Sequence, residues 1–369
     1  MTSVFYAYRD SPQRRAALAA APGSAERYLL FGLDELRARG YSVRHGLERD
    51  RGPRWASVTG GAAKRGLERA GGYGGDFATV LSSLRQANRA EVVFSTVDTV
   101  GIPLMLAARS GLLRAPLVYA AIGLPERLSQ LRSERMQRLY ASSLARCAAV
   151  LAYSAREAAD LEAWLVARGH DREVHFVPFG VDASVFRPVE PAPDVDVVSV
   201  GSDPHRHFEL LLEVARALPE RHFEIVASRD GAAFLGALPE NVHLELDLPF
   251  EQMRRRLESA RVVALPVRDN TYSGATTVLL QAMALGKPVV VSRTSAIATG
   301  YGLVDGDNCR LVEPGDSGGF AGALDHVLRD WLHARALGAS ARRTVEAGLT
   351  WDRYVDRIEA ILVGATRRP

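Results

Sequence analysis

The segment best suited to chemistry is DNTYSGATTVLLQAMALGKPVVVSRTSA, residues 269–296, where small polar residues run directly into an apolar helix. We expect the helix to begin near Ser273 or Gly274. The first turn of a helix exposes backbone N–H groups and the positive end of the helix dipole, and glycine there allows close approach to the backbone. The candidate ligands are Ser273, Gly274, Ala275, Thr276 and Thr277. This pattern predicts a diphosphate site, with ordinary N-capping by Ser and Thr as the alternative.

A second candidate for the same diphosphate is Arg206, in the loop VGSDPHRHFELL (200–211). Like the first segment, this loop follows a strand-like run. The planar guanidinium group of arginine suits bidentate binding of phosphate. The alternative is a solvated arginine at the start of a helix. Ser202 offers a hydroxyl group in the same loop, and His205 is interpreted as a surface residue.

In the first half of the chain, Asp98 is the acidic residue best placed at a strand end, directly after EVVFSTV (91–97). We expect its carboxylate either to orient the hydroxyl group of an acceptor or to cap the helix that follows. His45, which ends another strand-like run, is interpreted as structural. Cys147 and Cys309 lie far apart without metal-ligand spacing, so no disulfide framework is expected, which fits a reducing cytoplasm.

Strand-like and helix-like segments alternate along the whole chain, as is typical of α/β proteins with doubly wound parallel sheets. The Pro-bearing stretch 186–196 separates two such series and is interpreted as a linker between two domains. Ligands of these sheets bind beyond the carboxyl ends of the strands. The predicted strands are 4–8, 41–46, 91–97, 115–123, 148–154 and 173–180 in the first series, and 195–201, 222–228, 242–248, 261–267 and 287–293 in the second.

Three other segments carry specific expectations. Residues 25–40 have apolar positions at helical spacing and are predicted to form one helix that ends at Gly40. Residues 126–147 are predicted to form one basic helix, which is either a solvated face with ion pairs or a contact for a membrane surface or an acidic acceptor. The glycine-rich residues 49–76 are predicted to be a mobile loop of the kind that covers a substrate.

The charge of the chain is uneven. Residues 1–175 contain 25 Lys and Arg against 17 Asp and Glu, whereas residues 176–369 contain 21 against 26. A basic half is explained either by an arginine-rich surface or by an anionic partner, namely a membrane surface or an acidic acceptor. Nucleic acid is not expected, because no recognised binding motif is present. The longest uncharged stretch, 115–125, is too short to span a bilayer, and we find no export signal. We therefore expect a cytoplasmic protein that can contact the inner face of the membrane peripherally.

Several segments, in order, resemble family 4 glycosyltransferases, which are retaining enzymes with the GT-B fold. VLLQAMALGKPVVVS (278–292) looks like their segment LLEAMACGKPVV, and VHFVPFGVDASVFRP (174–188) is close to their signature at the domain junction. GSAERYLLFGLDELRARGYSV (23–43) resembles their N-terminal glycine loop and first helix. The resemblance covers nearly the whole chain. Its other members are the segments 148–161, 305–316 and 351–362.

The resemblance implies two doubly wound Rossmann-like domains that face each other across a cleft. Residues 1–185, joined by a C-terminal helix at 351–369, would bind the acceptor, and residues 186–350 would bind the nucleotide sugar. Gly23 and Ser24 would lie in the loop that faces the donor phosphate. The family needs no essential metal, and the sequence shows no carboxylate pair for one.

This chain departs from the family at the usual pair of glutamates, which are replaced by Ser273 and Gln281. In the family the first glutamate contacts the donor sugar and the second contacts the ribose. Gln281 can still hydrogen-bond a ribose, or it is a half-buried polar residue of the helix. In the family's basic diphosphate clamp, Ser202 replaces the first basic residue, and Arg206 lies one position from the second.

The expected reaction is therefore retaining transfer of a sugar from a nucleoside-diphosphate sugar to a hydroxyl group of a glycan, a lipid or a secondary metabolite. The base is left open among UDP, GDP and dTDP, and no other cofactor is expected. Arg206, Asp98 and Ser273 are the expected catalytic residues, and the leaving phosphate would itself take the proton of the acceptor. The alternatives are a degenerate, non-catalytic nucleotide-sugar-binding protein and a nucleotide-sugar epimerase on the same fold.

Overall fold

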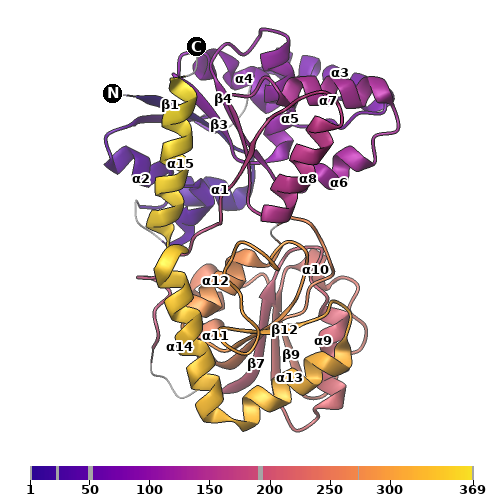
Figure 1. Ribbon diagram of the computed structural model, residues 1–369, viewed down its shortest axis with the longest axis vertical. Coiled ribbons are helices and arrows are strands. Elements are labelled where there is room, and N and C mark those ends of the chain that lie inside the picture. The colour runs from indigo at the N-terminus through magenta and orange to yellow at the C-terminus, as the bar shows by residue number, and fades with distance from the viewer. Residues whose placement is uncertain (1, 22–24, 49–52, 190–193, 273, 368–369) are drawn as a thin grey trace. The chain divides into compact units, whose positions relative to one another are not determined.

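The computed structural model describes residues 2–21, 25–48, 53–189, 194–272 and 274–367 (Figure 1). The chain divides into two compact units. Unit 1 comprises Met1–Val177 and Val355–Pro369, and unit 2 comprises Pro178–Tyr354.

The boundaries of the units differ from the predicted domain boundaries, which are 185/186 and 350/351. The stretch after Pro178 belongs to unit 2 because it is bonded there. The N–H of Val181 donates to the Leu349 carbonyl at 3.0 Å, and the N–H of Trp351 donates to the Val181 carbonyl at 2.9 Å. The N–H of Phe179 donates to the hydroxyl group of Tyr301 at 3.2 Å.

The core of unit 1 is a six-stranded parallel sheet with the order β2-β1-β3-β4-β5-β6. Every residue of β3, β4 and β5 is buried, which explains why these strands are continuously apolar rather than alternating. The sheet confirms the parallel arrangement predicted for this half. Its strands are β1 (Ser3–Ala7), β2 (Ser42–His45), β3 (Val92–Ser95), β4 (Leu117–Ala121), β5 (Ala149–Ala152) and β6 (Val174–Phe176).

Helices of unit 1 cover this sheet through an apolar cluster. Val80, Met105, Leu144 and Leu161 come from four different helices and share the cluster with Tyr119 of β4. The helices are α1 (Pro12–Ala19), α2 (Leu33–Ala38), α3 (Arg54–Arg69), α4 (Phe77–Ala87), α5 (Asp98–Arg109), α6 (Leu124–Ser129), α7 (Glu134–Leu144) and α8 (Ala155–Val166), with a 3₁₀ helix at Ala25–Leu30.

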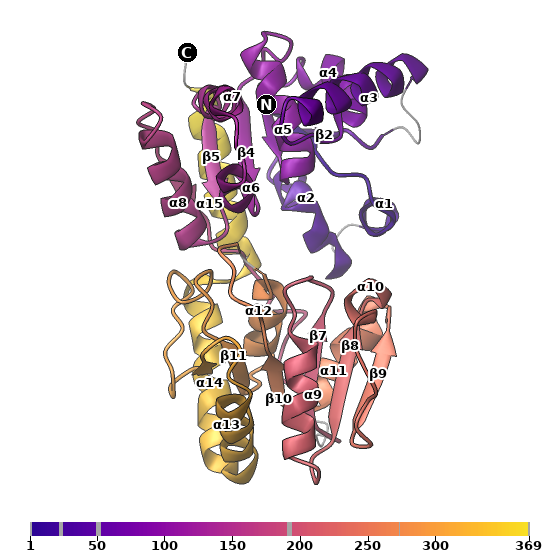
Figure 2. The same cartoon turned by 90° about the vertical axis from the view of Figure 1, so that its right-hand side faces the viewer.

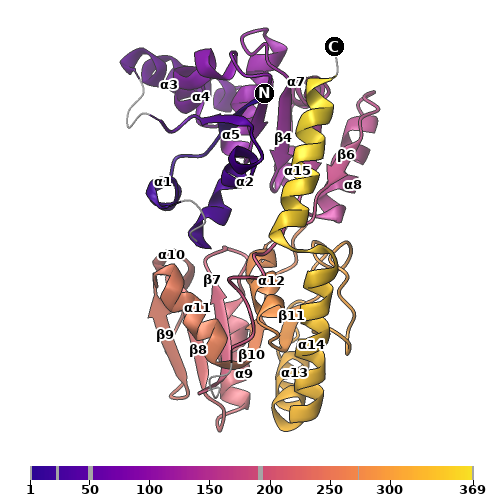
Figure 3. The ribbon, with the colours of Figure 1, turned by 90° about the vertical axis from the view of Figure 1, so that its left-hand side faces the viewer.

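The C-terminal helix α15 (Trp351–Thr366) supplies the last segment of unit 1, from Val355 onward. Within unit 1 it runs along the sheet (yellow in Figure 3), and Glu359 accepts a hydrogen bond of 2.8 Å from the hydroxyl group of Tyr41. Val355 also lies against Gly32, where an added Cβ would meet a methyl group at 3.2 Å.

Unit 2 contains a second six-stranded parallel sheet, with the order β12-β11-β10-β7-β8-β9. This sheet confirms the second doubly wound series. Seen from opposite sides, α9 and α13 cover one face and α11 lies on the other (Figures 2 and 3). The strands are β7 (Val195–Gly201), β8 (Phe223–Ala227), β9 (Val242–Leu246), β10 (Ala260–Leu265), β11 (Val289–Ser292) and β12 (Arg310–Val312). The helices are α9 (Phe208–Ala217), α10 (Arg229–Ala232), α11 (Phe250–Ser259), α12 (Thr276–Ala284), α13 (Ser317–Arg329) and α14 (Trp331–Gly348).

The expectation of a mobile loop at 49–76 is wrong for most of that segment, because α3 occupies Arg54–Arg69. The helix is held by close packing rather than by large apolar side chains. Its buried residues are Ala56 and Gly60, and a Cβ on Gly60 would lie 2.5 Å from the backbone nitrogen of Ala78. Glycine therefore serves here as a point of contact between helices rather than as a helix breaker.

Two predicted helices are each divided. The predicted helix 25–40 breaks at Phe31 and Gly32, whose φ angles are 54° and 85°, and helical residues have negative φ. The predicted basic helix 126–147 is interrupted between α6 and α7 because the chain turns inward to bury Leu131, which is 3% exposed. In the part of the chain that the structure describes, no helix combines the length and the apolar character needed to cross a membrane.

Candidate active site

The strand order in the sheet of unit 2 reverses between the neighbouring strands β7 and β10. From β7 the chain continues to β8 on one side, and from β10 it continues to β11 on the other. In such sheets the ligand binds outside the carboxyl ends of the two strands at this switch point. The two loops that follow them are joined there, since the N–H of His207 donates to the Pro266 carbonyl at 3.0 Å and that of Arg268 to the His205 carbonyl at 2.8 Å. We call these loops and the start of α12 the unit 2 site.

Arg206 occupies the centre of the unit 2 site and is only 4% exposed. Its side chain lies over Gly201, where an added Cβ would approach Nε to 2.1 Å. One guanidinium nitrogen, Nη2, donates to the carbonyl of Val200. Nε and Nη1 are buried and have no hydrogen-bond partner among the described residues. Burial lowers the pKa of Arg206 to about 10, against an opposing effect of Asp203. A buried cation with two unsatisfied donors is suited to an anionic ligand.

Asp203 fastens the two loops of the unit 2 site to each other. Its carboxylate accepts hydrogen bonds from the hydroxyl group of Tyr272 at 2.8 and 3.0 Å, and from the backbone N–H of His205 at 2.8 Å. The ring of His205 packs edge-on against Tyr272, with centroids 5.2 Å apart. Ser202, in the same loop, is exposed.

The start of α12 lies slightly later than predicted, with Thr276 as its first residue and Ala275 as its N-cap. Ala275 has a φ of 66°, a left-handed conformation that costs a non-glycine residue about 1–2 kcal/mol. Its methyl side chain cannot accept the hydrogen bonds that Ser or Thr would accept as an N-cap. Gly274 is buried, and a Cβ there would lie 3.5 Å from Asp203 Oδ1. The backbone at this helix start is therefore strained and close to the Arg206 loop, a combination that favours a functional role.

More polar atoms on the elements of this site are buried without a partner among the described residues. They include Asn270 Oδ1, Thr276 Oγ1 and Gln281 Oε1. These three residues are only 1% to 4% exposed, so bulk water does not satisfy these atoms. Thr277 is half-buried. Buried polar groups are nearly always hydrogen-bonded in folded proteins, so such a group of orphaned atoms is suited to a polar ligand. Ser273 lies outside the described residues.

In unit 1 the side chain of Asp98 does not cap a helix, which was one of its two expected roles. Asp98 is the first residue of α5, and its N-cap is Val97. The Asp98 carboxylate accepts hydrogen bonds from the hydroxyl group of Tyr119 at 2.7 Å and from the N–H of Ile122 at 3.3 Å. Burial raises the pKa of Asp98 to about 6. Its Oδ2 has no hydrogen-bond partner among the described residues, and Arg127 Nε lies 4.0 Å away.

Glu157 is a second buried carboxylate beside Asp98, and the sequence reasoning missed it. Its Oε1 accepts hydrogen bonds from the N–H groups of Gly123 and Leu124 at the start of α6. Burial, and secondly the charge of Asp98, raise the pKa of Glu157. The local signal was present but misleading, because Ser154 and Glu157 have the spacing of a capping box, and here the glutamate reaches a different helix. The two carboxylates together hold the turn at Ile122–Leu124, and Arg127 lies in the helix α6 that follows it.

A pocket of about 510 Å³ opens in unit 1 next to this turn. Both cations and carboxylates line it, with an aromatic hydroxyl group and several glycines. We call it the α3–α5 pocket, and its polar lining residues are Ser57, Lys64, Glu68, Tyr73, Asp76, Thr99 and Arg127. The predicted residues Gly23 and Ser24 lie outside the described residues. His45 is half-buried, with Nδ1 accepting a hydrogen bond of 3.3 Å from the N–H of Leu47, which fits a structural role.

Comparison with known proteins gives a consistent picture. Residues 194–330 match the family described as "Glycosyl transferases group 1". The chain is 29% identical over 208 residues to an MMP alpha-(1->4)-mannosyltransferase of Mycolicibacterium hassiacum, an alignment that covers 53% of this chain and 49% of that protein. The chain thus spans about half the length of this curated relative.

Solved structures resemble the whole chain. Sucrose-phosphate synthase from Thermosynechococcus elongatus superimposes with a TM-score of 0.72 at 17% identity, over 98% of each chain. Anabaena HepE in complex with UDP-glucose gives a TM-score of 0.68 at 16% identity, over 98% of this chain and 100% of that chain. At these identities the likeness shows the shared two-domain fold.

Proposed function

We propose that this chain is a glycosyltransferase that transfers a sugar from a nucleoside-diphosphate sugar to a hydroxyl group of an acceptor, with retention of configuration. The match of residues 194–330 to the group 1 glycosyltransferases and the two-domain GT-B fold support this proposal. Unit 2 would bind the donor and unit 1 the acceptor. The observation that carries the proposal is Arg206, a buried guanidinium group with two unpartnered nitrogens at the switch point of the unit 2 sheet.

The unit 2 site would hold the diphosphate. Nε and Nη1 of Arg206 would donate to phosphate oxygens, which satisfies both buried donors. The start of α12, at Gly274–Thr277, would add backbone N–H groups and the positive end of its dipole. Gln281 would bond the ribose, Ser202 and Ser273 would contact the donor, and Asn270 is a further candidate because its Oδ1 has no partner. The HepE structures contain UDP and UDP-glucose, so UDP-sugars are the first donors to test, before those of GDP and dTDP.

The chemistry requires charge stabilisation on the leaving group. As the bond between the anomeric carbon and the diphosphate oxygen breaks, negative charge develops on the diphosphate, and Arg206 with the α12 start would stabilise it. The acceptor oxygen forms the new bond to the same face of the anomeric carbon. Its proton passes to the departing phosphate oxygen, so the proposal needs no separate protein base and no metal ion.

The acceptor would bind in the α3–α5 pocket of unit 1. Lys64 and Arg127 are balanced by Glu68 and Asp76 in its lining, so hydrogen-bond donors and acceptors are both present without an excess of either charge. Such a lining suits the hydroxyl groups of a sugar better than a strongly anionic acceptor. Asp98 would act through Arg127, which lies 4.0 Å from its carboxylate. We also propose that the basic half of the chain, on the cytoplasmic side, contacts an anionic membrane peripherally.

The experiment that tests the function is product analysis by NMR. The protein would be incubated with UDP-, GDP- and dTDP-sugars and with a panel of glycoside acceptors. A new glycosidic bond with the anomeric configuration of the donor supports the proposal, and an inverted product contradicts it. Donor binding without any transfer would favour the non-catalytic alternative, and conversion of the donor into an epimer would favour an epimerase.

Two variants test the roles of individual residues. Arg206→Ala should weaken the affinity for the nucleoside diphosphate, and Gln281→Glu should change the affinity for the nucleoside. Unchanged affinity in either variant would remove that residue from the proposed site. Arg127→Gln should raise the KM for the acceptor and leave the KM for the donor unchanged, because Arg127 lines the unit 1 pocket that we assign to the acceptor.

A further inference from the structure

An apolar groove with a basic rim lies on unit 1 between the start of α3 and the second half of α4. Its volume is about 890 Å³. Trp55, at the first turn of α3, is 57% exposed, and Val58 on the next turn is 71% exposed. A tryptophan so exposed on a folded surface is unusual. We call this feature the Trp55 groove, and its lining includes Pro53, Trp55, Leu81, Leu84, Arg85 and Arg89.

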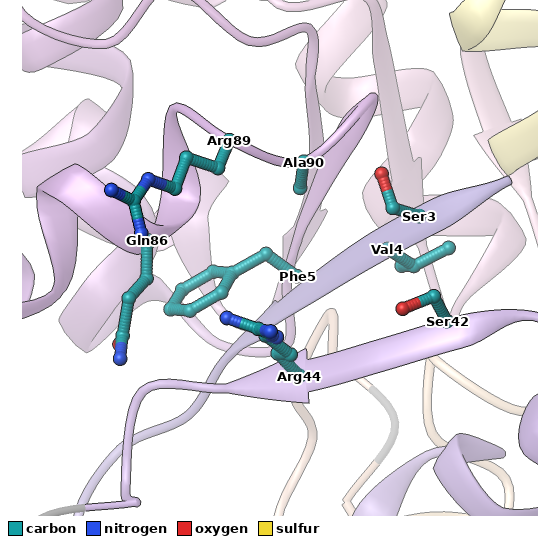
Figure 4. Close-up of a pocket in the computed structure, with 8 residues that line it drawn as sticks. All are labelled: Ser3, Val4, Phe5, Ser42, Arg44, Gln86, Arg89 and Ala90. Atoms are coloured by element: carbon teal, nitrogen blue, oxygen red, sulfur yellow. The ribbon is translucent and has the colours of Figure 1, made fainter.

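A smaller pocket of about 260 Å³ continues from the groove and shares Gln86 and Arg89 with it (Figure 4). In Figure 4 the side chain of Gln86 lies below that of Arg89, and the side chain of Arg44 lies beside the ring of Phe5. Arg44 comes from the edge strand β2, and Arg89 comes from the segment that follows α4. Together the groove and the pocket bring three arginines to one face.

The three arginines, Arg44, Arg85 and Arg89, are exposed, and no side-chain hydrogen bond or ion pair is found for them among the described residues. No carboxylate of the described residues lines either cavity. The acidic residues nearby do not line the cavities, but they accept hydrogen bonds from residues that do. Glu48 accepts from the side chain of Gln86 at 3.3 Å, and Glu91 accepts from the N–H of Ser3 at 2.6 Å. The lining of the two cavities is therefore basic, and the carboxylates of Glu48 and Glu91 beside it offset only part of its charge.

The Trp55 groove and the α3–α5 pocket both use residues of α3 and α4, but they share no lining residue. Ser3 and Ser42, which line the smaller pocket, are the first residues of β1 and β2. They stand at the amino ends of their strands, whereas the turn that Asp98 holds begins at Ile122, directly after the carboxyl end of β4. Substitutions of Trp55, Arg44, Arg85 or Arg89 would thus change no residue that lines the α3–α5 pocket.

We propose that the Trp55 groove and its three arginines form the surface through which unit 1 docks on an anionic phospholipid membrane. Arginines at such a surface attract the lipid phosphates, and tryptophan prefers the boundary between headgroups and acyl chains. A small soluble anion would account for the arginines but not for the exposed Trp55 and Val58 beside them. The proposal names the residues of the peripheral contact proposed above and rests on it, but docking requires neither donor nor transfer.

The test is co-sedimentation of the full chain with vesicles, measured without any donor. The vesicles contain phosphatidylcholine alone or with 30% phosphatidylglycerol. One basic residue near an anionic membrane contributes about fivefold to partitioning. The triple variant Arg44→Gln/Arg85→Gln/Arg89→Gln should therefore partition about 100-fold more weakly, and Trp55→Ala should also weaken binding.

A matched control removes the same charge from unit 2. Arg255, Arg343 and Arg353 are also exposed, and no side-chain partner is found for them among the described residues. Their triple change to Gln should alter partitioning by less than about fivefold. The proposal is overturned if wild type does not bind anionic vesicles, or if the groove variant binds them as well as wild type does. It is also overturned if the control variant loses as much binding as the groove variant. Glycerol phosphate at millimolar concentration should not displace the protein from vesicles, and displacement would identify a small-molecule site instead.

Failure of docking and failure of the proposed function are distinguishable. The groove variant should keep its affinity for the nucleoside diphosphate and its transfer to a soluble acceptor. Wild type without donor affinity but with vesicle binding would contradict the proposed function alone.

Discussion

Replacing Arg206 with methionine should stabilise the ligand-free protein and weaken donor binding at the same time. Methionine has a similar length and carries no charge. The lowered pKa of Arg206, about 10, corresponds to about 3 kcal/mol of disfavoured charge at neutral pH. The substitution also loses the hydrogen bond to the Val200 carbonyl, worth about 1 kcal/mol. We therefore expect the free energy of unfolding to rise by about 1–2 kcal/mol, which corresponds to a few degrees in Tm.

The effect on binding should have the opposite sign. Nε and Nη1 of Arg206 are free to donate to the diphosphate, and a hydrogen bond to a charged group contributes about 1.5–3 kcal/mol. Two such bonds amount to at least about 3 kcal/mol, which is a rise in Kd of about 100-fold. Arg206→Met should accordingly have a higher Tm than wild type without ligand and a smaller Tm rise with it.

The assay is thermal and urea unfolding with and without the nucleoside diphosphate. Arg342 provides the control, because its guanidinium group donates to the carbonyls of Ala183, Phe186 and Ala284. Arg342→Met should therefore lower the free energy of unfolding and leave the Kd unchanged. The reasoning is refuted if Arg206→Met is less stable than wild type without ligand and binds the nucleotide equally well, since Arg206 would then be a structural residue.

Three further predictions, the last with a control variant, concern the packing and the charges. Gly201→Ala should raise the Kd for the donor about tenfold or more with little loss of stability, because the new methyl group would lie 2.1 Å from Arg206 Nε and displace the guanidinium group. Asp98 has a pKa raised to about 6 from 3.8, so the folded state takes up the proton first. Relative to Asp98→Asn, wild type should gain about 2 kcal/mol in the free energy of unfolding as the pH falls from 7 to 4. Gly338→Ala should lose about 1–3 kcal/mol because its Cβ would lie 2.0 Å from a backbone carbonyl oxygen after α12, whereas Gly322→Ala, with nothing within 4 Å, should gain about 0.5–1 kcal/mol.

Each of these expectations has a clear contrary result. Donor titrations that give the same Kd for Gly201→Ala and wild type would show that Arg206 need not hold its observed position. If the free energies of unfolding of wild type and Asp98→Asn changed with pH in the same way between pH 4 and 7, the raised pKa of Asp98 would be contradicted. Equal stabilities of the two glycine variants would show that the close approach at Gly338 relaxes without cost.

The sequence predicted most of the fold because buried parallel strands are continuous apolar runs. Eleven of the twelve strands in the described residues were predicted, whereas β12, which has only three residues, Arg310–Val312, was not. The helix α3 was also missed. Its contact with α4 uses Ala56 and Gly60, and small residues give no apolar periodicity.

The residues of the candidate site could be proposed from their types and positions in the sequence, but their burial and their neighbours could not. The spacing after two strands indicated Arg206 and the α12 start, and the switch point of the sheet places both loops together. The burial of Arg206 depends on Gly201 beneath its side chain and on the pairing of Arg206 with Val267. Glu157 could not be predicted as a neighbour of Asp98, because its contact with the turn at Gly123 joins residues far apart in the chain.

The most direct test of the account is calorimetric titration of the wild-type chain with UDP, GDP and dTDP. The account predicts that one of them binds with a stoichiometry of one, and that the same titration of Arg206→Met shows about 100-fold weaker binding. If none of the three binds at millimolar concentration, or if the variant binds as tightly as wild type, the buried guanidinium group is not a diphosphate ligand.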